Sequence, residues 1–290
     1  MTRPLVAFLL SFLVTGLGQL YNGQLKKAVI LFLLLLLIPF LFGAARFTTN
    51  FSGYTAMLAI MLGIWLYGIS DAIIQARRRK EYAKKKYNRW YVYLFIGIVI
   101  TAATWFYEKA PISGMQHFII VSPSQLPTMQ LGDRVLADIH AYREKQPDYG
   151  QIVVFNQPGE EVWCFRVAGL PGDTIQVIDD ILVVNGVISE SRHIRNVQIE
   201  GVPVQEYEEK MVSGHKHRIY SNQKAAGLPS SSSDKIVVPD NCYYLLGDNR
   251  GNALDSRYIG PVSADNILGQ VLFSIWGRSY DRVNVDFRNR

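Results

Sequence analysis

Residues 90–107 read WYVYLFIGIVITAATWFY and contain no charged side chain. About 20 apolar residues, rising ~1.5 Å each along a helix, cross the hydrocarbon core of a bilayer. Aromatic residues stand at both ends of the stretch, Trp90 and Tyr91 at its start and Trp105 and Tyr107 at its close. Such belts are typical of membrane–water interfaces. The stretch predicts a transmembrane anchor over 90–107, and the chain changes character on either side of it.

Three further uncharged stretches precede the anchor and predict a membrane region over residues 1–75 with about three spans. They are Pro4–Leu20, Ala28–Ala45 and Phe47–Ser70. The first is the weakest, because glycines and a glutamine lie near its end, so a re-entrant or interfacial helix and a cleaved signal peptide are alternatives. The text of residues 16–24, GLGQLYNGQ, weakly resembles the turn of small TM2-like membrane hairpins.

A basic loop at residues 76–89 predicts the orientation of these spans. Arg77–Arg89 contains eight lysines and arginines and one acid, Glu81. Loops rich in lysine and arginine stay in the cytoplasm. The chain beyond Glu108 is then extracytoplasmic, and with four spans the N-terminus would lie outside as well.

Composition and charge exclude several classes of protein. The chain has 290 residues, 49% hydrophobic, with 30 basic and 24 acidic side chains. It is too apolar for a disordered chain and too long for a disulfide-stapled miniprotein. Residues 1–110 carry 13 basic and 3 acidic side chains, and residues 111–290 carry 17 and 21. The basic excess lies between apolar stretches, so a nucleic-acid partner is not expected, whereas the lipid bilayer is.

The remainder, residues 108–290, predicts an all-β domain. Short runs rich in Val and Ile are separated by turn residues such as Asn185-Gly186. Residues 187–234 look like a polar insertion. The predicted strands are His117–Val121, Arg134–Ile139, Gln151–Phe155, Thr174–Val177, Ile181–Val184, Lys235–Val238, Tyr243–Leu246 and Ile267–Trp276.

Three segments of this domain resemble the boxes of type I signal peptidases. The first is Val121–Met129, VSPSQLPTM, followed by Gly132-Asp133. The second is Arg166–Asp173, RVAGLPGD. The third is Gly247–Arg250, GDNR, followed by Asp255–Gly260, DSRYIG. All three occur in the family's order after a membrane anchor.

The resemblance implies a serine endopeptidase that removes signal peptides from secretory preproteins, with no cofactor and no metal. It implies a multi-pass protein of the bacterial inner (plasma) membrane, with the signal-peptidase-like β domain on the periplasmic face. Association with the export machinery would follow from such a role.

On the family's pattern Ser124 matches the nucleophile, and Ser122 matches a side chain of the oxyanion hole. A serine hydroxyl needs a base within hydrogen-bond reach, and a buried lysine can serve. The preceding strand would hold the substrate as an added β-strand. Its residues are His117, Phe118, Ile119, Ile120 and Val121.

Two departures from the pattern concern the base. Phe165 stands where the family has its general-base lysine, and Ala253 stands where a serine usually hydrogen-bonds that lysine. Phenylalanine accepts no proton, and the neighbouring Arg166 stays protonated. We interpret the two replacements as one event, the loss of the base. His117 is the one histidine expected to approach Ser124.

We expect the other residues of the third box to have structural roles. Asp255 and Arg257 form a candidate charge pair, and Asp248 is a candidate cap for the turn around Asn249 and Arg250. His215 and His217 lie in the polar insertion, where solvated side chains are commoner than metal ligands. Two cysteines, Cys164 and Cys242, allow either one disulfide or two separate thiols.

Three functions remain open on the sequence. One is a signal peptidase in which Ser124 still cleaves. A second is a catalytically impaired homologue that binds signal peptides or partner peptidases without cutting. A third is a membrane scaffold that acts through its first 80 residues.

Overall fold

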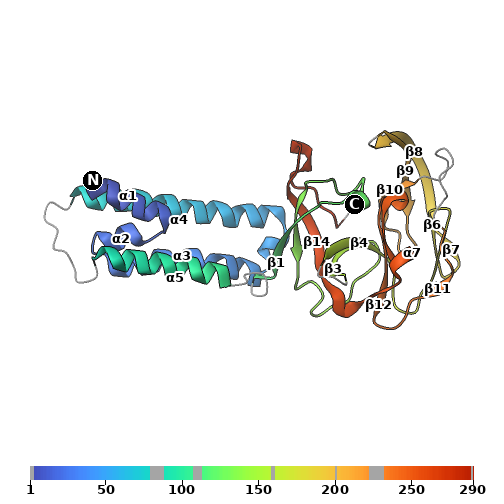
Figure 1. Ribbon diagram of the computed structural model, residues 1–290, viewed down its shortest axis with the longest axis horizontal. Coiled ribbons are helices and arrows are strands. Elements are labelled where there is room, and N and C mark those ends of the chain that lie inside the picture. The colour runs from blue at the N-terminus through green and yellow to red at the C-terminus, as the bar shows by residue number, and fades with distance from the viewer. Residues whose placement is uncertain are drawn as a thin grey trace. The chain divides into compact units, whose positions relative to one another are not determined.

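The protein consists of two compact units, Met1–Gly114 and Met115–Arg290. A computed structural model describes residues 3–78, 88–106, 113–157, 161–199, 201–221, 232–288 and 290. The first unit is helical and the second is built almost wholly of strands (Figure 1). The boundary follows the anchor and precedes the first predicted strand.

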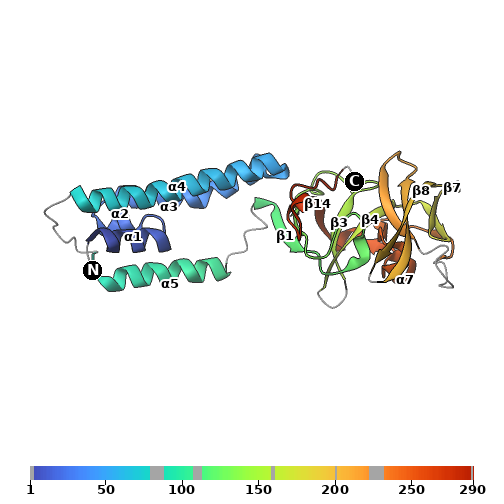
Figure 2. The same cartoon turned by 90° about the horizontal axis from the view of Figure 1, so that it is seen from above.

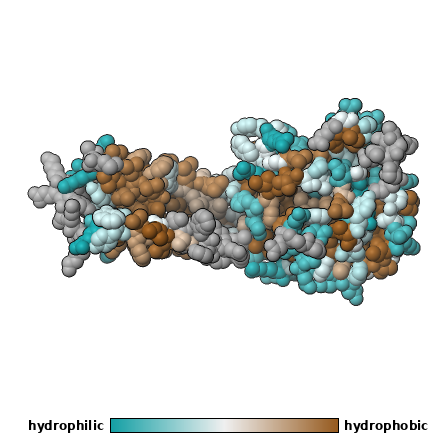
Figure 3. Space-filling view, viewed as in Figure 1, coloured by the Kyte–Doolittle hydropathy of each residue, from teal (hydrophilic) through white to brown (hydrophobic). Residues whose placement is uncertain are grey.

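Among the described residues of the helical unit, two helices are long and apolar enough to cross a membrane, α3 and α4. Many large apolar side chains of these helices are exposed, Leu33, Leu36 and Leu41 among them, and Figure 3 shows hydrophobic surface over this unit. Exposed apolar surface of this extent suits a lipid environment rather than water. The helices are α1 Arg3–Leu13, α2 Leu17–Tyr21, α3 Leu25–Ala44, α4 Phe51–Arg78 and α5 Trp90–Phe106.

The stretch Pro4–Leu20 differs from a single span, because the chain turns sharply at Gly16. Helix α1 has 11 residues, or ~16 Å at 1.5 Å each, which is about half of a hydrocarbon core. Gly16 has a left-handed φ of 101°, and a Cβ there would stand 2.6 Å from the Ala28 carbonyl oxygen. Only glycine fits this turn, which sends the chain into the short helix α2.

Helix α1 runs antiparallel to α4 (Figures 1 and 2). Near its start Ala7 is buried with Ala72, and near its end the Phe12 ring lies 5.4 Å from Trp65. The start of α1 is therefore at the end of α4 that leads to the basic loop. The segment therefore forms a helical hairpin rather than one continuous helix.

Polar side chains of residues 19–27, from α2 to the start of α3, hold this part of the chain against α4. Gln19 Nε2 donates to the Gly68 carbonyl oxygen at 2.6 Å, and Asn22 Nδ2 donates to that of Ala72 at 2.8 Å. Lys27 Nζ lies 2.7 Å from Asp71 Oδ1. Hydrogen bonds between apolar helices bring polar groups together away from lipid.

The described residues of the β unit form three antiparallel sheets. The largest has the strand order β1-β2-β14-β3-β4-β12-β13, the second β11-β5-β6-β7 and the third β10-β9-β8. The elements are β1 Met115–Ile119, β2 Arg134–Asp138, β3 Ile152–Asn156, β4 Val162–Gly169, β5 Thr174–Ile178, β6 Ile181–Val184, β7 Val187–Ile188, β8 Glu190–Ile199, β9 Val202–Lys210, β10 Lys216–Ser221, β11 Ile236–Val237, β12 Cys242–Leu246, α7 Ser256–Ile259, β13 Val262–Ser263 and β14 Ile267–Trp276.

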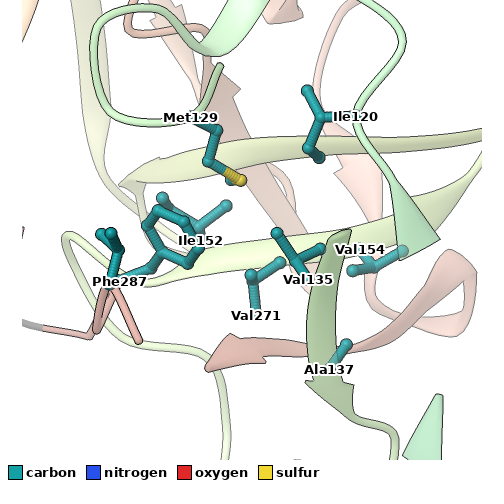
Figure 4. Close-up of a cluster of buried hydrophobic side chains, with 9 residues drawn as sticks. Ile120, Met129, Val135, Ala137, Ile152, Val154, Val271 and Phe287 are labelled. Atoms are coloured by element: carbon teal, nitrogen blue, oxygen red, sulfur yellow. The ribbon is translucent and has the colours of Figure 1, made fainter. Parts of the chain in front are cut away.

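Alternating residues of the large sheet build its core. Val135 and Ala137 of β2, with Ile152 and Val154 of β3, point into one cluster. Figure 4 shows them in one cluster with Ile120 and Met129, and Met129 is fully buried. The period of two along each strand places every second side chain in the cluster. This core supports the segment that follows β1.

Three parts of the β unit differ from the strands predicted from sequence, and one of them is the short strand β13, which no predicted strand covers. The segment Val162–Gly169 forms β4, and the polar insertion contains the long strands β8, β9 and β10. Charged pairs across the strands replace apolar contacts in that sheet, since Arg195 and Arg218 both bond to the buried carboxylate of Glu206. A search for apolar runs does not detect such strands. The Asn185-Gly186 turn has two positive φ angles, as that pair predicts.

We expect Gly18→Ala to destabilise the helical unit. A Cβ at Gly18 would stand 2.1 Å from Ser11 Oγ and 2.5 Å from the Ala7 carbonyl oxygen. Overpacking of this kind costs about 1–3 kcal/mol. The matched control is Gly63→Ala in α4, where nothing lies within 4 Å of the new Cβ. The melting temperatures of both variants in detergent, followed by circular dichroism, should fall for Gly18→Ala alone; equal melting would contradict this packing.

Candidate functional site

Ser124 lies in a tight turn directly after the first strand. Ser122 is extended, with φ −118° and ψ 146°, and a short 3-10 turn covers Pro123–Gln125. The hydroxyls of Ser122 and Ser124 lie 2.8 Å apart, and the backbone N–H of Ser124 donates to Ser122 Oγ at 3.3 Å. Proline at the start of the turn fixes its first φ angle. The turn thus presents two bonded hydroxyls at the surface.

Residues of the third box hydrogen-bond to this turn. The backbone N–H of Asn249 donates to the Ser124 carbonyl oxygen at 3.0 Å, and Asn249 Nδ2 donates to that of Pro123 at 3.1 Å. The N–H of Asp248 donates to Gln125 Oε1 at 2.9 Å. Residues 122–125 and 248–249, far apart in sequence, are therefore one unit in space.

A buried ion pair joins the second box to the third. Arg166 Nη2 and Nε donate to the two carboxylate oxygens of Asp248 at 2.6 and 2.8 Å, and both side chains are almost completely buried. Thr128 Oγ1 also donates to Asp248, at 2.5 Å. Burial by itself would raise the pKa of Asp248, but the Arg166 guanidinium outweighs it and lowers the pKa below its usual value.

Two further buried pairs surround this centre, as sequence reasoning expected for Asp255 and Arg257. Arg257 bonds to both oxygens of Asp255 at 2.8 Å, and Asp255 accepts the N–H of Gly247 at 2.9 Å. Arg250 bonds to Glu209 of β9 at 2.6 Å. Pairing makes these buried charges tolerable. The Arg250–Glu209 pair joins the third box to the β8–β10 sheet, and the Asp255–Arg257 pair stabilises the third box itself.

Phe165 is buried on the face of β4 opposite Arg166. Its ring packs against Phe155 and Trp163, with centroids 5.8 and 6.0 Å away. A Cβ placed on Gly247 would be 3.4 Å from Phe165 Cε1, 2.4 Å from Ala253 Cβ and 2.8 Å from the Ser124 carbonyl oxygen. Phe165, Ala253 and the Ser124 backbone therefore meet around Gly247.

A groove of about 570 Å³ runs beside Ser124. It lies between the chain leaving β1 and the start of β4. Several residues that line the groove were predicted from the sequence. Glu161, Trp163 and Leu254 were not assigned to the site, because none of them belongs to one of the three quoted motifs. The lining of the groove comprises Ile119, Ile120, Val121, Ser122, Ser124, Gln125, Glu161, Val162, Trp163, Cys164, Phe165 and Leu254.

The segment expected to hold substrate, residues 117–121, is only partly strand, because β1 ends at Ile119. Phe118 and Ile120 pack against the core, whereas Ile119 and Val121 are exposed at 55% and 80%. His117 is not among the described residues that line the groove. Burial lowers the pKa of His117. The exposed side chains at 119 and 121 thus face the groove's solvent side.

The two cysteines do not pair, and the histidines of the insertion stack on one another. Cys164 and Cys242 are both free, so the disulfide alternative is wrong. Cys164 and Cys242 pack in different core clusters, which separates them. The rings of His215 and His217 stack 5.7 Å apart, and the described residues hold no group of three metal-ligating side chains.

The family model for signal peptidase, peptidase S26, matches residues 88–276. The chain belongs to this family. Signal peptidase IB of Staphylococcus aureus (strain MRSA252) is 28% identical over 206 residues, which cover 71% of this chain and 98% of that protein. Signal peptidase I of Bacillus caldolyticus is 27% identical over 193 residues, 67% of this chain and 92% of the relative.

A solved signal peptidase I from Enterococcus faecalis V583 is 24% identical to this chain. The match covers 43% of this chain and 97% of that one, with a TM-score of 0.29. The helices α1 to α4 lie outside the family match, which begins at residue 88. The family's region therefore comprises α5 and the β unit up to the end of β14.

We expect acid to weaken the fold in part through Glu209. Burial would raise the pKa of Glu209, but Arg250 and His217 outweigh it and lower the pKa to about 2. Since the unfolded value is ~4.3, the ionised carboxylate stabilises the fold above about pH 4, and this contribution is lost as the pH falls toward 2.

Glu209→Gln should therefore unfold more easily at neutral pH, by about 3–5 kcal/mol, because it leaves Arg250 buried without its charge partner. It should also lose part of the acid dependence below pH 4. Urea unfolding followed by tryptophan fluorescence measures both. The control Glu208→Gln removes a surface pair with Arg192 and should cost less than about 1 kcal/mol. Equal costs for the two variants would contradict the buried-pair account.

Proposed function

We propose that the β domain receives the signal peptide of an exported preprotein as an extended strand in the groove beside Ser124. Strand β1 is the edge of its sheet, with β2 as its neighbour. On the other wall, β12 pairs with β4 at Arg166, Val167 and Gly169, which leaves β3 as the described neighbour of residues 162–165. Unpaired strand edges bind extended peptides through their backbone groups.

We assign the role of nucleophile to Ser124 and a role in the oxyanion hole to Ser122, and we propose that the general base is missing. The observation that carries this proposal is the bonding of the Ser124 hydroxyl. Among the described residues it bonds to the Ser122 hydroxyl and to no amine, imidazole or carboxylate. Phe165 stands where the base would stand, next to Gly247 and Ala253. A serine without a base is a poor nucleophile.

The nearby ionisable groups do not supply that base. The Glu161 carboxylate accepts from Trp163 Nε1, and among the described residues no hydrogen bond joins it to the Ser124 hydroxyl. The thiol of Cys164 has a pKa that burial raises to about 12, so it is protonated at neutral pH. Arg166 points to the opposite face of β4 and is held by Asp248. The function best supported is therefore capture of a signal peptide with little or no cleavage.

Cleavage by Ser124 is the second candidate function. The arrangement that favours it is the turn itself, in which Ser124 is partly exposed and its N–H bonds to Ser122 Oγ. A base supplied by the substrate or by a partner protein would complete such a site. Peptide capture and cleavage would both use the groove beside this turn.

We propose that the protein lies in the bacterial plasma membrane with the β domain outside and the N-terminus in the cytoplasm. The positive-inside rule places Arg77 and Arg78, at the end of α4, in the cytoplasm. Because α1 is antiparallel to α4, its start lies at the same end. The two long helices α3 and α4, with the shorter predicted anchor α5 as a third span, then carry the chain outward.

Proteolysis of right-side-out spheroplasts tests this topology. With an epitope tag ahead of Met1, external protease should spare the tag and digest the chain beyond residue 114. The same treatment after lysis should remove the tag. Removal of the tag in intact spheroplasts would support four spans instead, and survival of the β domain would contradict its external position.

Restoring a base should restore cleavage. Phe165→Lys with Ala253→Ser supplies an amine beside Ser124 and a hydroxyl to orient it, and burial lowers the pKa of that amine. General-base assistance contributes about 10²–10⁴-fold. We expect the unaltered protein to bind a model preprotein but leave it intact, and the double variant to cleave it.

The control adds Ser124→Ala to the double variant, which should abolish the gained cleavage. Rapid cleavage by the unaltered protein that Ser124→Ala removes would contradict the missing base. If the preprotein does not bind at all, the scaffold function becomes the better account.

A further inference from the structure

We propose that the groove selects an extended apolar peptide that carries one basic side chain, placed against Glu161. This inference rests on the proposed function and names the class of peptide that the groove takes. Eleven of the twelve lining residues are uncharged, and Glu161 alone brings a formal charge. Ile119, Val121 and Val162 provide much of the apolar surface around it.

Hydrogen bonds hold both the side chain and the backbone of Glu161 in place. Trp163 Nε1 donates to Glu161 Oε2 at 2.9 Å. The Glu161 carbonyl oxygen accepts the N–H of Gln157 at 2.9 Å, which fixes the backbone where the chain enters β4. No lysine, arginine or histidine within the described ranges pairs with this carboxylate. Buried carboxylates of the same domain, such as Glu206 and Asp248, have arginine partners.

A peptide that fills the groove removes water from Glu161. A carboxylate that loses water without gaining a partner opposes binding, because the desolvation of a charge is costly. A lysine or arginine on the peptide supplies that partner and offsets the desolvation of Glu161. The groove therefore binds a peptide with a basic side chain at that position more tightly. An apolar peptide with a neutral side chain at that position binds less well.

The Trp163 ring beside Glu161 favours arginine over lysine. The indole of Trp163 is fixed by its bond to Glu161 and packs edge-on against Phe165, with ring planes at 82°. A guanidinium can bond to the carboxylate while stacking on an aromatic ring, which an ammonium group does less well. We therefore expect arginine to exceed lysine at this position.

The test measures binding of fluorescent signal-peptide analogues to the full-length protein in detergent. One arginine is moved through the peptide, and each analogue is compared with the same peptide carrying citrulline, which has nearly the same shape and no charge. At one position arginine should bind about threefold to tenfold more tightly than citrulline. Added salt should reduce that ratio.

The variant Glu161→Gln keeps an oxygen for the Trp163 N–H and removes the charge, so the arginine preference should fall to about one. Glu144→Gln is the matched control, because it removes the same charge from an exposed position that does not line the groove. It should retain the preference, which excludes a general effect of net charge.

The outcomes separate this inference from the proposed function. Equal binding of arginine and citrulline peptides at every position, or a preference that survives in Glu161→Gln, overturns the role of Glu161 and leaves peptide capture intact. Failure of all analogues to bind contradicts peptide capture itself, and the selectivity with it.

Discussion

The buried ion pair between Arg166 and Asp248 is the interaction on which the rest of the β domain depends. Its members come from β4 and from the turn after β12, and Thr128, beyond the nucleophile turn, bonds to the same carboxylate. An arginine or aspartate buried alone would be strongly destabilising, so all three segments must be in place together. The backbone of Asp248 and Asn249 is then positioned to bond to Gln125 and Ser124.

The same pair determines where residue 165 points. Successive residues of a strand face opposite sides, so fixing Arg166 toward Asp248 directs Phe165 toward Gly247 and Ala253. An aromatic ring is accommodated there by Phe155 and Trp163. The backbone edges of β1 and β4 do not depend on which side chain stands at 165. Peptide capture and bond cleavage are therefore separable in this fold, and one can persist without the other.

Sequence reasoning anticipated the convergence of the three boxes, the Asp255–Arg257 pair and most of the apolar strands, because each has a local signature. It missed β8 to β10, where Glu206 is buried among arginines rather than apolar side chains. It missed β4 as a strand, although β4 carries both Phe165 and Arg166. It did not distinguish a span from a hairpin at Pro4–Leu20, because the decisive contact of Gly16 is with distant Ala28. Glu161 has no motif, and its place beside the groove emerges only from pairing of β3 with β4.

The central claim is that Ser124 keeps its place in the groove but lacks a base to activate it. The most direct measurement is the intact mass of the full-length protein after incubation with a fluorophosphonate, a reagent that phosphonylates activated serines. The missing base predicts no adduct at neutral pH while signal-peptide binding is retained. Rapid formation of an adduct on Ser124 at neutral pH would contradict it, since only a serine with a working base reacts in this way.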